Sequence, residues 1–530
     1  MPNDCVRSWL TLHTVRLAAV PAAAFIAACL DRGYQTDYWQ HLARGRLIAR
    51  EGAVVSVDRF TYTVAGQPFQ DNNWLTQLLY HALHSAGGLE LVQALNAAVL
   101  AVTLALVVRM CRKASGSSGV AAVVGAVCFL GLWQTFLIRP QTFSMLLFVL
   151  LYALLRRARE RPSVLVFVPL IMAVWANVHG GFAVGLALIL AHAAGAAIDL
   201  LILRSGEGRS VHLFRLLACL ITAVAATLAN PYGWGVYRYA GRLSAVGVER
   251  GIEEWMPPSV GSLNGVVCAA SLVAVAALVL WSWRRVTWTE LCIACCFAVP
   301  SFVSTRMTIW WFLAAAPIAA RLAAGCVQRV GVTSDEGAPV ENFTPARPSL
   351  AAGTALGLLF AACALSLPWL DSVNPIMDSV RTSRRVEADL AAVATRLPTS
   401  TAIDATRPGV TPITRRLFTR MEWANYFAWA CDGQLPVFVE GHVELYPAAV
   451  WDEYLIVDDA RPGWEAVLDR RKVDLLVLDR AYHGRLIDEV ARSPQWEQKR
   501  REGPAVVFER RRDEEMRPGD SVAGSVEGND

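Results

Sequence analysis

Charged residues are scarce in this chain of 530 residues. They make up 18% of it, whereas hydrophobic residues make up 55%, and the mean hydropathy is +0.37. A soluble globular domain contains about 25% charged residues. The shortage therefore excludes an ordinary soluble enzyme and predicts a protein that crosses a membrane several times. The net charge of +4 is too small to indicate nucleic-acid binding.

Several catalytic motifs are also missing. The sequence contains no phosphate-binding P-loop, no nucleophile-elbow serine, no zinc-binding set of His and Cys, and no dinucleotide fingerprint. Their absence argues against ATP-driven transport. Twelve cysteines are present, but most lie inside apolar runs, where Cys behaves as a small hydrophobic residue. They therefore provide no disulfide framework.

Apolar runs, in contrast, are abundant. Runs close to the ~20 residues that a helix needs to cross a bilayer predict about eleven spans. Their approximate limits are 15–30, 89–110, 118–137, 142–156, 163–178, 181–203, 213–229, 261–283, 288–304, 307–327 and 350–370. We interpret the first run as an uncleaved spanning helix rather than a signal peptide, because many further spans follow it.

The connections between these runs alternate in character. One set is basic, and the positive-inside rule places it in the cytoplasm. Its members contain Arg109–Lys113, Arg156–Arg161, Arg204–Arg215, Arg284–Arg285 and Arg321–Arg329. The other set carries motif-like polar residues and falls on the outer side. Its members contain Asp37–His41, Arg139–Pro140, Asn177–Gly180, Asn230–Tyr232, Glu253–Trp255 and Arg306. Their convergence on one membrane face predicts an active site at the boundary between water and lipid.

The first outer connection, residues 31–88, is long and predicts its own structure. Tyr38–Arg50 has apolar residues broadly on one side and is expected to form an amphipathic helix in the interface, with His41, Arg44, Arg46 and Arg50 as its polar surface. A short strand is expected within Val54–Val64. A second helix should begin after Asn72 and Asn73 and stop at Gly87–Gly88.

The chain divides into a membrane domain, residues 1–370, and a soluble domain, residues 371–512. Residues 330–349 are expected to form a flexible cytoplasmic loop, and residues 513–530 a disordered tail. Beyond residue 370, short β-rich runs alternate with helical stretches, which predicts a small α/β domain. The β-rich runs are Val437–Glu440, Leu475–Leu478 and Ala505–Glu509. An odd number of spans and a cytoplasmic N-terminus place this domain outside the cytoplasm.

Asp37 is the leading candidate for catalysis. It opens the interfacial helix near the lipid headgroups, where a carboxylate can take a proton from an incoming hydroxyl or amine. The same residue type at a helix start also caps free backbone N–H groups, and the two roles are compatible. Asp31 is the second candidate acid. His41 follows Asp37 by one turn, so both side chains can face one pocket, where His41 can orient a phosphate or the carboxylate.

Two arginines on the outer side are candidates for binding an anion. Arg139 precedes Pro140 between two apolar runs, where a charge is costly unless it is paired or reaches water. Arg306 stands alone in an outer turn, where positive charge is disfavoured. A guanidinium matches phosphate oxygens through paired hydrogen bonds. Snorkelling toward the interface is the alternative interpretation for both residues.

Asn177 and His179 interrupt an apolar stretch with a donor-rich turn. The glycines that follow allow the backbone to approach a ligand closely. We expect both side chains to line a pocket through hydrogen bonds. A metal-ligand role for His179 is disfavoured because no partner stands at a suitable spacing.

The sequence resembles the GT-C superfamily of integral membrane glycosyltransferases and, more closely, a group of bacterial membrane proteins within it. The matching stretches are DYWQHLARGRLI, DRFTYTVAGQPFQDNNWLTQLLYH, IRPQTFS, WANVHGGFAVG, NPYGWGVY and VFVEGHVELY. The resemblance implies a helical membrane domain, an outer C-terminal domain, and sugar transfer from a polyprenyl-phosphate donor with Asp37 at the acidic position. Many members have paired acids there, whereas Tyr38 follows Asp37. The need for a divalent metal is therefore left open, with Asp31 or Asp71 as the partner acid.

Together these features predict an inverting glycosyltransferase in a bacterial inner membrane. The expected partners are a polyprenyl-phosphate sugar donor, a glycan, lipid or protein acceptor, and membrane lipids, with no nucleic acid. Two alternatives remain. A transporter or flippase for a lipid-linked glycan would need polar residues at mid-membrane depth and often an internal repeat. A non-catalytic protein of envelope assembly would need none of the candidate residues.

Overall fold

The computed structural model describes residues 10–30, 36–202, 207–329, 349–370, 374, 378–397 and 415–511. The chain splits into two compact units. The first is Met1–Val57 with Pro68–Arg385, and the second is Asp58–Gln67 with Val386–Asp530. Of the predicted cytoplasmic loop at 330–349 only the last residue is described, and the predicted tail at 513–530 and Asp31 lie outside the described residues.

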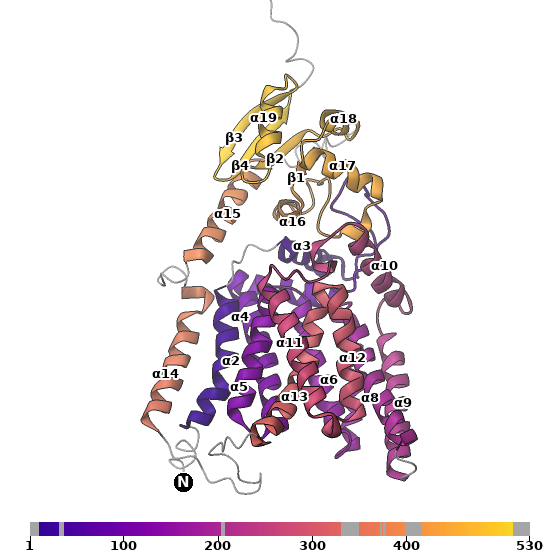
Figure 1. The fold of residues 1–530 in the computed structure, drawn as a ribbon. Helices are drawn as coiled ribbons and strands as arrows, with labels where there is room; N and C mark the ends of the chain where they lie inside the picture. The colour runs from indigo at the N-terminus through magenta and orange to yellow at the C-terminus, as the bar shows by residue number, and fades with distance from the viewer. Residues whose placement is uncertain are drawn as a thin grey trace, which may run out of the picture. The chain divides into compact units, whose positions relative to one another are not determined.

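The first unit is a bundle of helices (Figure 1). Its long or apolar members are α2 (Leu12–Cys29), α4 (Trp74–Ser115), α5 (Ser118–Leu132), α6 (Gln141–Arg157), α7 (Phe167–Val178), α8 (Phe182–Ile202), α9 (Glu207–Thr227), α11 (Leu263–Trp281), α12 (Trp288–Val303), α13 (Thr305–Arg329) and α14 (Leu350–Leu365). Within the described part of the chain, seven helices are long and apolar enough to cross a membrane, and Pro162–Val178, α12 and α14 are shorter apolar helices. Each of the eleven expected spans overlaps a helix, but α6 is in neither of these groups. The chain is therefore a multi-pass membrane protein, and the expected number of eleven spans stays a prediction.

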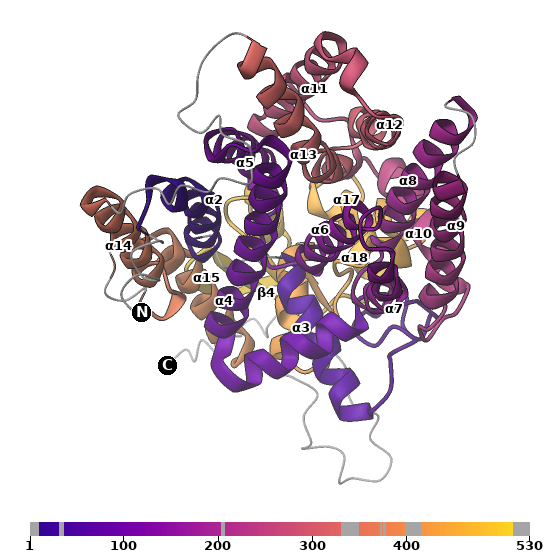
Figure 2. The same cartoon turned by 90° about the horizontal axis from the view of Figure 1, so that it is seen from below.

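The bundle has central helices and helices at its edge. Viewed from below, α4, α6 and α13 lie near the centre, and α14 and α2 form one edge (Figure 2). Helix α2 packs against both α4 and α14. Helix α13 is the most buried of the candidate spans, with 72% of its apolar window inside the protein. The core side chains are mainly aliphatic and aromatic, as ridge-into-groove packing of helices requires.

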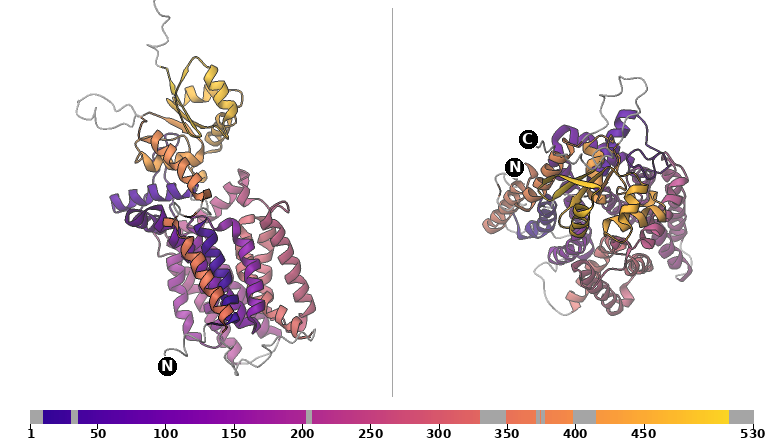
Figure 3. Two further views of the ribbon diagram at one scale, coloured as in Figure 1. Left: turned by 90° about the vertical axis from the view of Figure 1, so that its left-hand side faces the viewer. Right: turned by 90° about the horizontal axis from the view of Figure 1, so that it is seen from above.

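Helix α4 bends sharply at the predicted break. Gly87 and Gly88 have non-helical backbone angles, and Gly88 has φ 69°, a conformation that favours glycine. The part before the bend lies beside α3 (Thr36–Glu51), and both run across the direction of the bundle (Figure 3). The approach of the two helices is close because Gly45 has no side chain: a Cβ there would lie 2.1 Å from the carbonyl oxygen of Gln77.

The prediction of a polar face on α3 is wrong in part. Trp39 and Leu42 are buried as expected, but Arg44 is fully buried and His41 is 5% exposed. The guanidinium carbon of Arg44 lies 4.3 Å from the ring centroid of Phe69. The middle of α3 is therefore covered by neighbouring segments, whereas Arg46 is half-buried and Arg50 is exposed, as expected of a polar surface.

Further helical segments connect the spans. They are η1 (Trp133–Thr135), η2 (Pro162–Val166), η3 (Glu253–Trp255), η4 (Trp283–Arg285), η5 (Pro368–Leu370) and α10 (Gly235–Glu249), and α15 (Asp378–Ala394) follows the last span. Helix α10 was not expected from the sequence.

The second unit contains a four-stranded sheet in the order β1-β2-β4-β3. Its strands are β1 (Leu417–Thr419), β2 (Leu475–Asp479), β3 (Trp496–Glu502) and β4 (Ala505–Arg510). Strands β1 and β2 are parallel, and the other pairs are antiparallel. The helical elements of this unit are α16 (Met421–Ala430), η7 (Val443–Leu445), α17 (Ala448–Asp458), α18 (Trp464–Arg470) and α19 (Gly484–Arg492). The small mixed domain expected at this end of the chain is confirmed.

Part of the first outer connection belongs to this second unit. Thr61 forms a parallel bridge with Val437, and the hydroxyl of Thr63 donates to the carbonyl of Phe438 at 2.6 Å. The strand expected within Val54–Val64 is reduced to two isolated bridges, one from Val57 to Pro68 and one from Thr61 to Val437. Val437 likewise forms bridges only, in place of the strand expected at Val437–Glu440.

Candidate functional site

Arg139 lies at the centre of the candidate site. It directly precedes Pro140, the N-cap of α6, and its side chain is 24% exposed. Its Nε lies 2.8 Å from Oδ2 of Asp37, in the first turn of α3. Its Nη1 also donates to the carboxylate of Glu254 in η3. The two carboxylates raise the pKa of Arg139 against the lowering effect of burial, so the guanidinium stays charged.

Arg306 completes the group from the start of α13. Its Nη1 lies 3.8 Å from the second carboxylate oxygen of Glu254. Its guanidinium carbon lies 5.1 Å from the ring centroid of Trp255, a cation–π distance. Asp37, Arg139, Glu254 and Arg306, here called the charge cluster, therefore alternate in sign and come from four separate elements.

The segment that carries Glu254 is hydrogen-bonded to the start of α13. The Ser304 hydroxyl donates to the Glu254 carbonyl at 3.0 Å and accepts from the Arg306 N–H at 3.2 Å. The Thr305 N–H donates to the Met256 carbonyl at 2.8 Å. These bonds hold the backbone of Glu254 close to the backbone of Arg306, so that their side chains can form an ion pair.

The charges of Arg306 and Arg139 also act on His179. The hydrogen bonds of the His179 ring fix which of its nitrogens carries the proton. The Gly181 N–H donates to its Nδ1 at 3.0 Å, so Nδ1 carries no proton. The Ser144 hydroxyl, 2.9 Å from the same Nδ1, must therefore donate as well, and its oxygen accepts from the Trp175 indole N–H. The ring proton is therefore on Nε2. Burial, together with the positive charge of Arg306, lowers the pKa of His179 to about 3. His179 is thus a neutral hydrogen-bond donor at physiological pH.

Asn177 and His41 are held by protein groups. The Asn177 amide donates to the carbonyls of Ala173 and Ala229, at 2.8 and 2.7 Å, and its oxygen accepts from the Trp74 indole at 2.9 Å. It joins three segments behind His179. His41 lies 3.4 Å from the Gln77 amide through its Nδ1. Their predicted contacts with a substrate stay predictions.

Asn72 was missed as a site residue. It is 3% exposed, and within the described part of the chain neither atom of its amide has a hydrogen-bond partner. Its amide nitrogen lies 3.9 Å from where a Cβ of Gly180 would stand, beside the His179 turn. A buried amide without partners is costly unless a ligand or water satisfies it. The sequence indicated a helix cap here, and Asn73 is the N-cap residue, although its side chain makes no cap bond.

Glu254 was also undervalued. The sequence placed Glu253–Trp255 among the outer connections with motif-like residues, and nothing in its spacing indicated which acid would face inward. The signal that could have found it is charge balance: two outer arginines at apolar run ends require anions nearby.

The described residues do not fit a divalent metal. Among them, no group of three or more His, Cys, Asp or Glu side chains is arranged to hold one. Asp37 and Glu254 both face guanidinium groups. Asp71, the other proposed partner acid, is 1% exposed and accepts from the Gln77 amide at 2.8 Å.

The chain resembles solved structures in its fold, and the comparisons by sequence find no match. No family model matches the chain, and no curated protein matches it. Among solved structures, it is similar to the oligosaccharyltransferase of Archaeoglobus fulgidus in its apo form, with a TM-score of 0.54 and 12% sequence identity. The match covers 87% of this chain and 69% of the archaeal one. At this identity the likeness concerns the fold alone: the chain has a fold like that of this oligosaccharyltransferase.

Proposed function

We propose that the protein is an inverting membrane glycosyltransferase that takes its sugar from a polyprenyl-phosphate donor. The observation that carries the proposal is the charge cluster, in which two carboxylates and two guanidinium groups from distant segments meet. The oligosaccharyltransferase-like fold supports it. So does the resemblance of short motifs to a bacterial group of GT-C proteins. The proposed setting is the outer face of a bacterial inner membrane.

Each part of the donor has a matching feature. The polyprenyl tail stays among the apolar helices, and the phosphate reaches the membrane boundary. Arg139 and Arg306 are the cations for that phosphate, because a guanidinium fork matches its oxygens. The neutral His179 presents an Nε2–H for sugar or phosphate oxygens. Asn72 presents an amide that has no partner among the described residues.

The transfer step follows from these positions. The acceptor hydroxyl or amine gives its proton to the Asp37 carboxylate while its O or N atom attacks the anomeric carbon. The bond between that carbon and the phosphate oxygen breaks, and the electron pair leaves with the phosphate. Arg139 and Arg306 stabilise the charge that develops there. Attack opposite the leaving group inverts the anomeric configuration.

Glu254 has a distinct role in this scheme. Its two carboxylate oxygens face the two arginines that the donor phosphate needs. A carboxylate and a phosphate compete for the same guanidinium donors. Glu254 therefore balances the arginines before the donor binds, and the phosphate takes its place. Arg139 keeps Asp37 oriented throughout through its Nε.

The test is sugar transfer by purified protein from a series of polyprenyl-phosphate sugars. Asp37→Asn should reduce turnover by roughly 10²-fold or more while donor binding is retained. Asp58→Asn is a matched control, because Asp58 caps a local turn at Thr61. Unchanged turnover in Asp37→Asn would exclude Asp37 as the base. Movement of a lipid-linked sugar across vesicles without transfer would favour the transporter instead.

A further inference from the structure

A second polar site lies at the other end of the same helices. Helix α13 carries Arg306 near its start and Arg321 fifteen residues later, which is ~22 Å further along a helix. Helix α4 likewise ends at Ser115, next to the basic residues Arg112 and Lys113. These ends belong to the basic turns that the positive-inside rule assigns to the cytoplasmic boundary.

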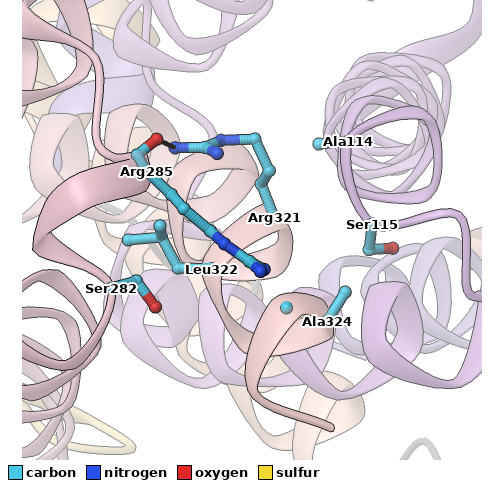
Figure 4. A pocket seen from close by; sticks show the side chains of 8 residues that line it. Ala114, Ser115, Ser282, Arg285, Arg321, Leu322 and Ala324 are labelled. Carbon is cyan, nitrogen blue, oxygen red and sulfur yellow. Dashed lines mark hydrogen bonds between the residues drawn. The ribbon is translucent and has the colours of Figure 1, made fainter. Parts of the chain in front are cut away.

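A cavity of about 200 Å³ opens there between the end of α4, η4 and the end of α13. Arg285, Arg321, Ser115 and Ser282 line it, and small residues leave room between them. Figure 4 shows Arg285 extending across the cavity toward Ala324, with the Arg321 guanidinium bonded to the Arg285 carbonyl. The nearness of Gly325 allows this, since a Cβ there would stand 3.3 Å from Nη1 of Arg285.

The positive charge of this cavity is only partly balanced. Arg321 donates from Nε to Glu290 at 2.6 Å and forms a second bond to the same carboxylate through Nη2. For Arg285, no acidic partner is found among the described residues. One guanidinium in a cavity thus remains available for an anion, and the serine hydroxyls stand nearby.

The surroundings of the cavity are those of a lipid boundary. Trp281 and Trp283 are 65% and 53% exposed, and Leu280, on the adjoining turn of α11, is 75% exposed. Exposed tryptophans beside basic residues are typical of the headgroup level of a membrane. Basic pockets between spanning helices on the cytoplasmic side are suited to lipid phosphates. An apolar helix surface next to the cation favours a lipid over a soluble anion.

We propose that this cavity binds the phosphate of an anionic phospholipid, with Arg285 as the residue that contacts it. The guanidinium fork of Arg285 pairs with two phosphate oxygens, and the acyl chains lie along the exposed apolar surface of α11. The site is separate from the charge cluster, so this proposal does not depend on the glycosyltransferase function.

The test is lipid titration of the purified full-length protein in detergent, followed by native mass spectrometry. Phosphatidylglycerol should bind with a resolvable affinity, and phosphatidylcholine should bind more weakly. Arg285→Gln should weaken phosphatidylglycerol binding roughly tenfold, since bonds to a charged group are lost. Arg284→Gln changes an exposed neighbour that does not line the cavity; it is the matched control and should bind like the wild type.

A second arm separates the lipid from a soluble anion. Thermal stability is measured with phosphatidylglycerol, with glycerol 3-phosphate and with inorganic phosphate. Stabilisation by the lipid alone, lost in Arg285→Gln, supports the proposal. Equal stabilisation by the soluble phosphates would overturn the lipid assignment. Equal lipid binding by wild type and Arg285→Gln would overturn the site. Gly325→Leu, which fills the cavity, should reproduce the loss without removing a charge.

Discussion

At the scale of single residues, the site is defined by how its charges are shared. Asp37 and Glu254 both contact Arg139, and Glu254 also faces Arg306. The proposed base is therefore oriented by the same cation that is to meet the donor phosphate. Such an arrangement couples the occupancy of the phosphate site to the position of the base.

Glu254→Gln tests this sharing. Removing the negative charge frees both arginines, so the donor should bind several-fold more tightly, seen as a lower KM for the polyprenyl-phosphate sugar. Glu253→Gln, whose side chain is exposed in the same short helix, is the control and should leave KM unchanged. A higher KM in Glu254→Gln would mean that Glu254 contacts the substrate rather than competing with it.

His179 predicts a pH effect. Its pKa is about 3 in the fold because burial disfavours the charged ring, against about 6.5 in an unfolded chain. As the pH falls below 6.5, the unfolded state therefore gains a proton that the fold does not accept, and stability is lost progressively down to about pH 3. His179→Gln lacks this titration, so its melting temperature should fall less than that of the wild type between pH 7 and pH 5. Parallel curves would contradict the neutral, buried state of His179.

At the scale of elements, α3 is positioned by its contact with α4. Gly45 lies directly against the Gln77 carbonyl, so any side chain there must push the helices apart. Gly45→Ala should destabilise the protein by about 1–3 kcal/mol and lower transfer activity, because Asp37 moves with α3. Thermal unfolding in detergent measures the first effect. Gly241→Ala in α10, where a Cβ would meet nothing within 4 Å, should be neutral. Equal behaviour of the two variants would contradict the close helix contact.

The elements differ in how well the sequence predicts them. The break at Gly87–Gly88 was predictable, since two adjacent glycines interrupt a helical pattern. Strand β3 was not, because its residues are mostly charged and it pairs only with β4, as a sheet-edge strand does. Burial of Arg44 was also unpredictable: periodicity marks the polar side of α3 but says nothing of a second covering segment.

At the scale of the whole molecule, the alternating charge of the connections predicted the grouping of distant residues. Asp37, Arg139 and Arg306 were all assigned to one membrane face, and the structure brings them together through Glu254. Charge balance indicates that an acid lies near the two arginines, but the sequence does not show that this acid is Glu254, because the position of its loop depends on bonds from Ser304 and Thr305. Nor could the sequence predict that Asp58–Gln67 joins the second unit, since that depends on a backbone pairing with Val437.

The same charge pattern predicts the orientation of the chain. The basic turns at Arg156–Arg161 and Arg284–Arg285 should face the cytoplasm, and the C-terminal domain should face outward. Alkaline phosphatase fused after the last residue should be active in intact bacteria, because this enzyme works only after export, whereas β-galactosidase at the same point should be inactive. The reverse pattern would place the C-terminal domain in the cytoplasm. That domain could then not contact an acceptor on the outer side of the membrane.

The most direct measurement is a structure of the protein with a non-transferable polyprenyl-phosphate sugar bound. We expect phosphate density against the guanidinium groups of Arg139 and Arg306, Glu254 displaced from between them, and the anomeric carbon facing Asp37. A lipid phosphate bound elsewhere, with the charge cluster still closed on Glu254, would contradict the proposed function.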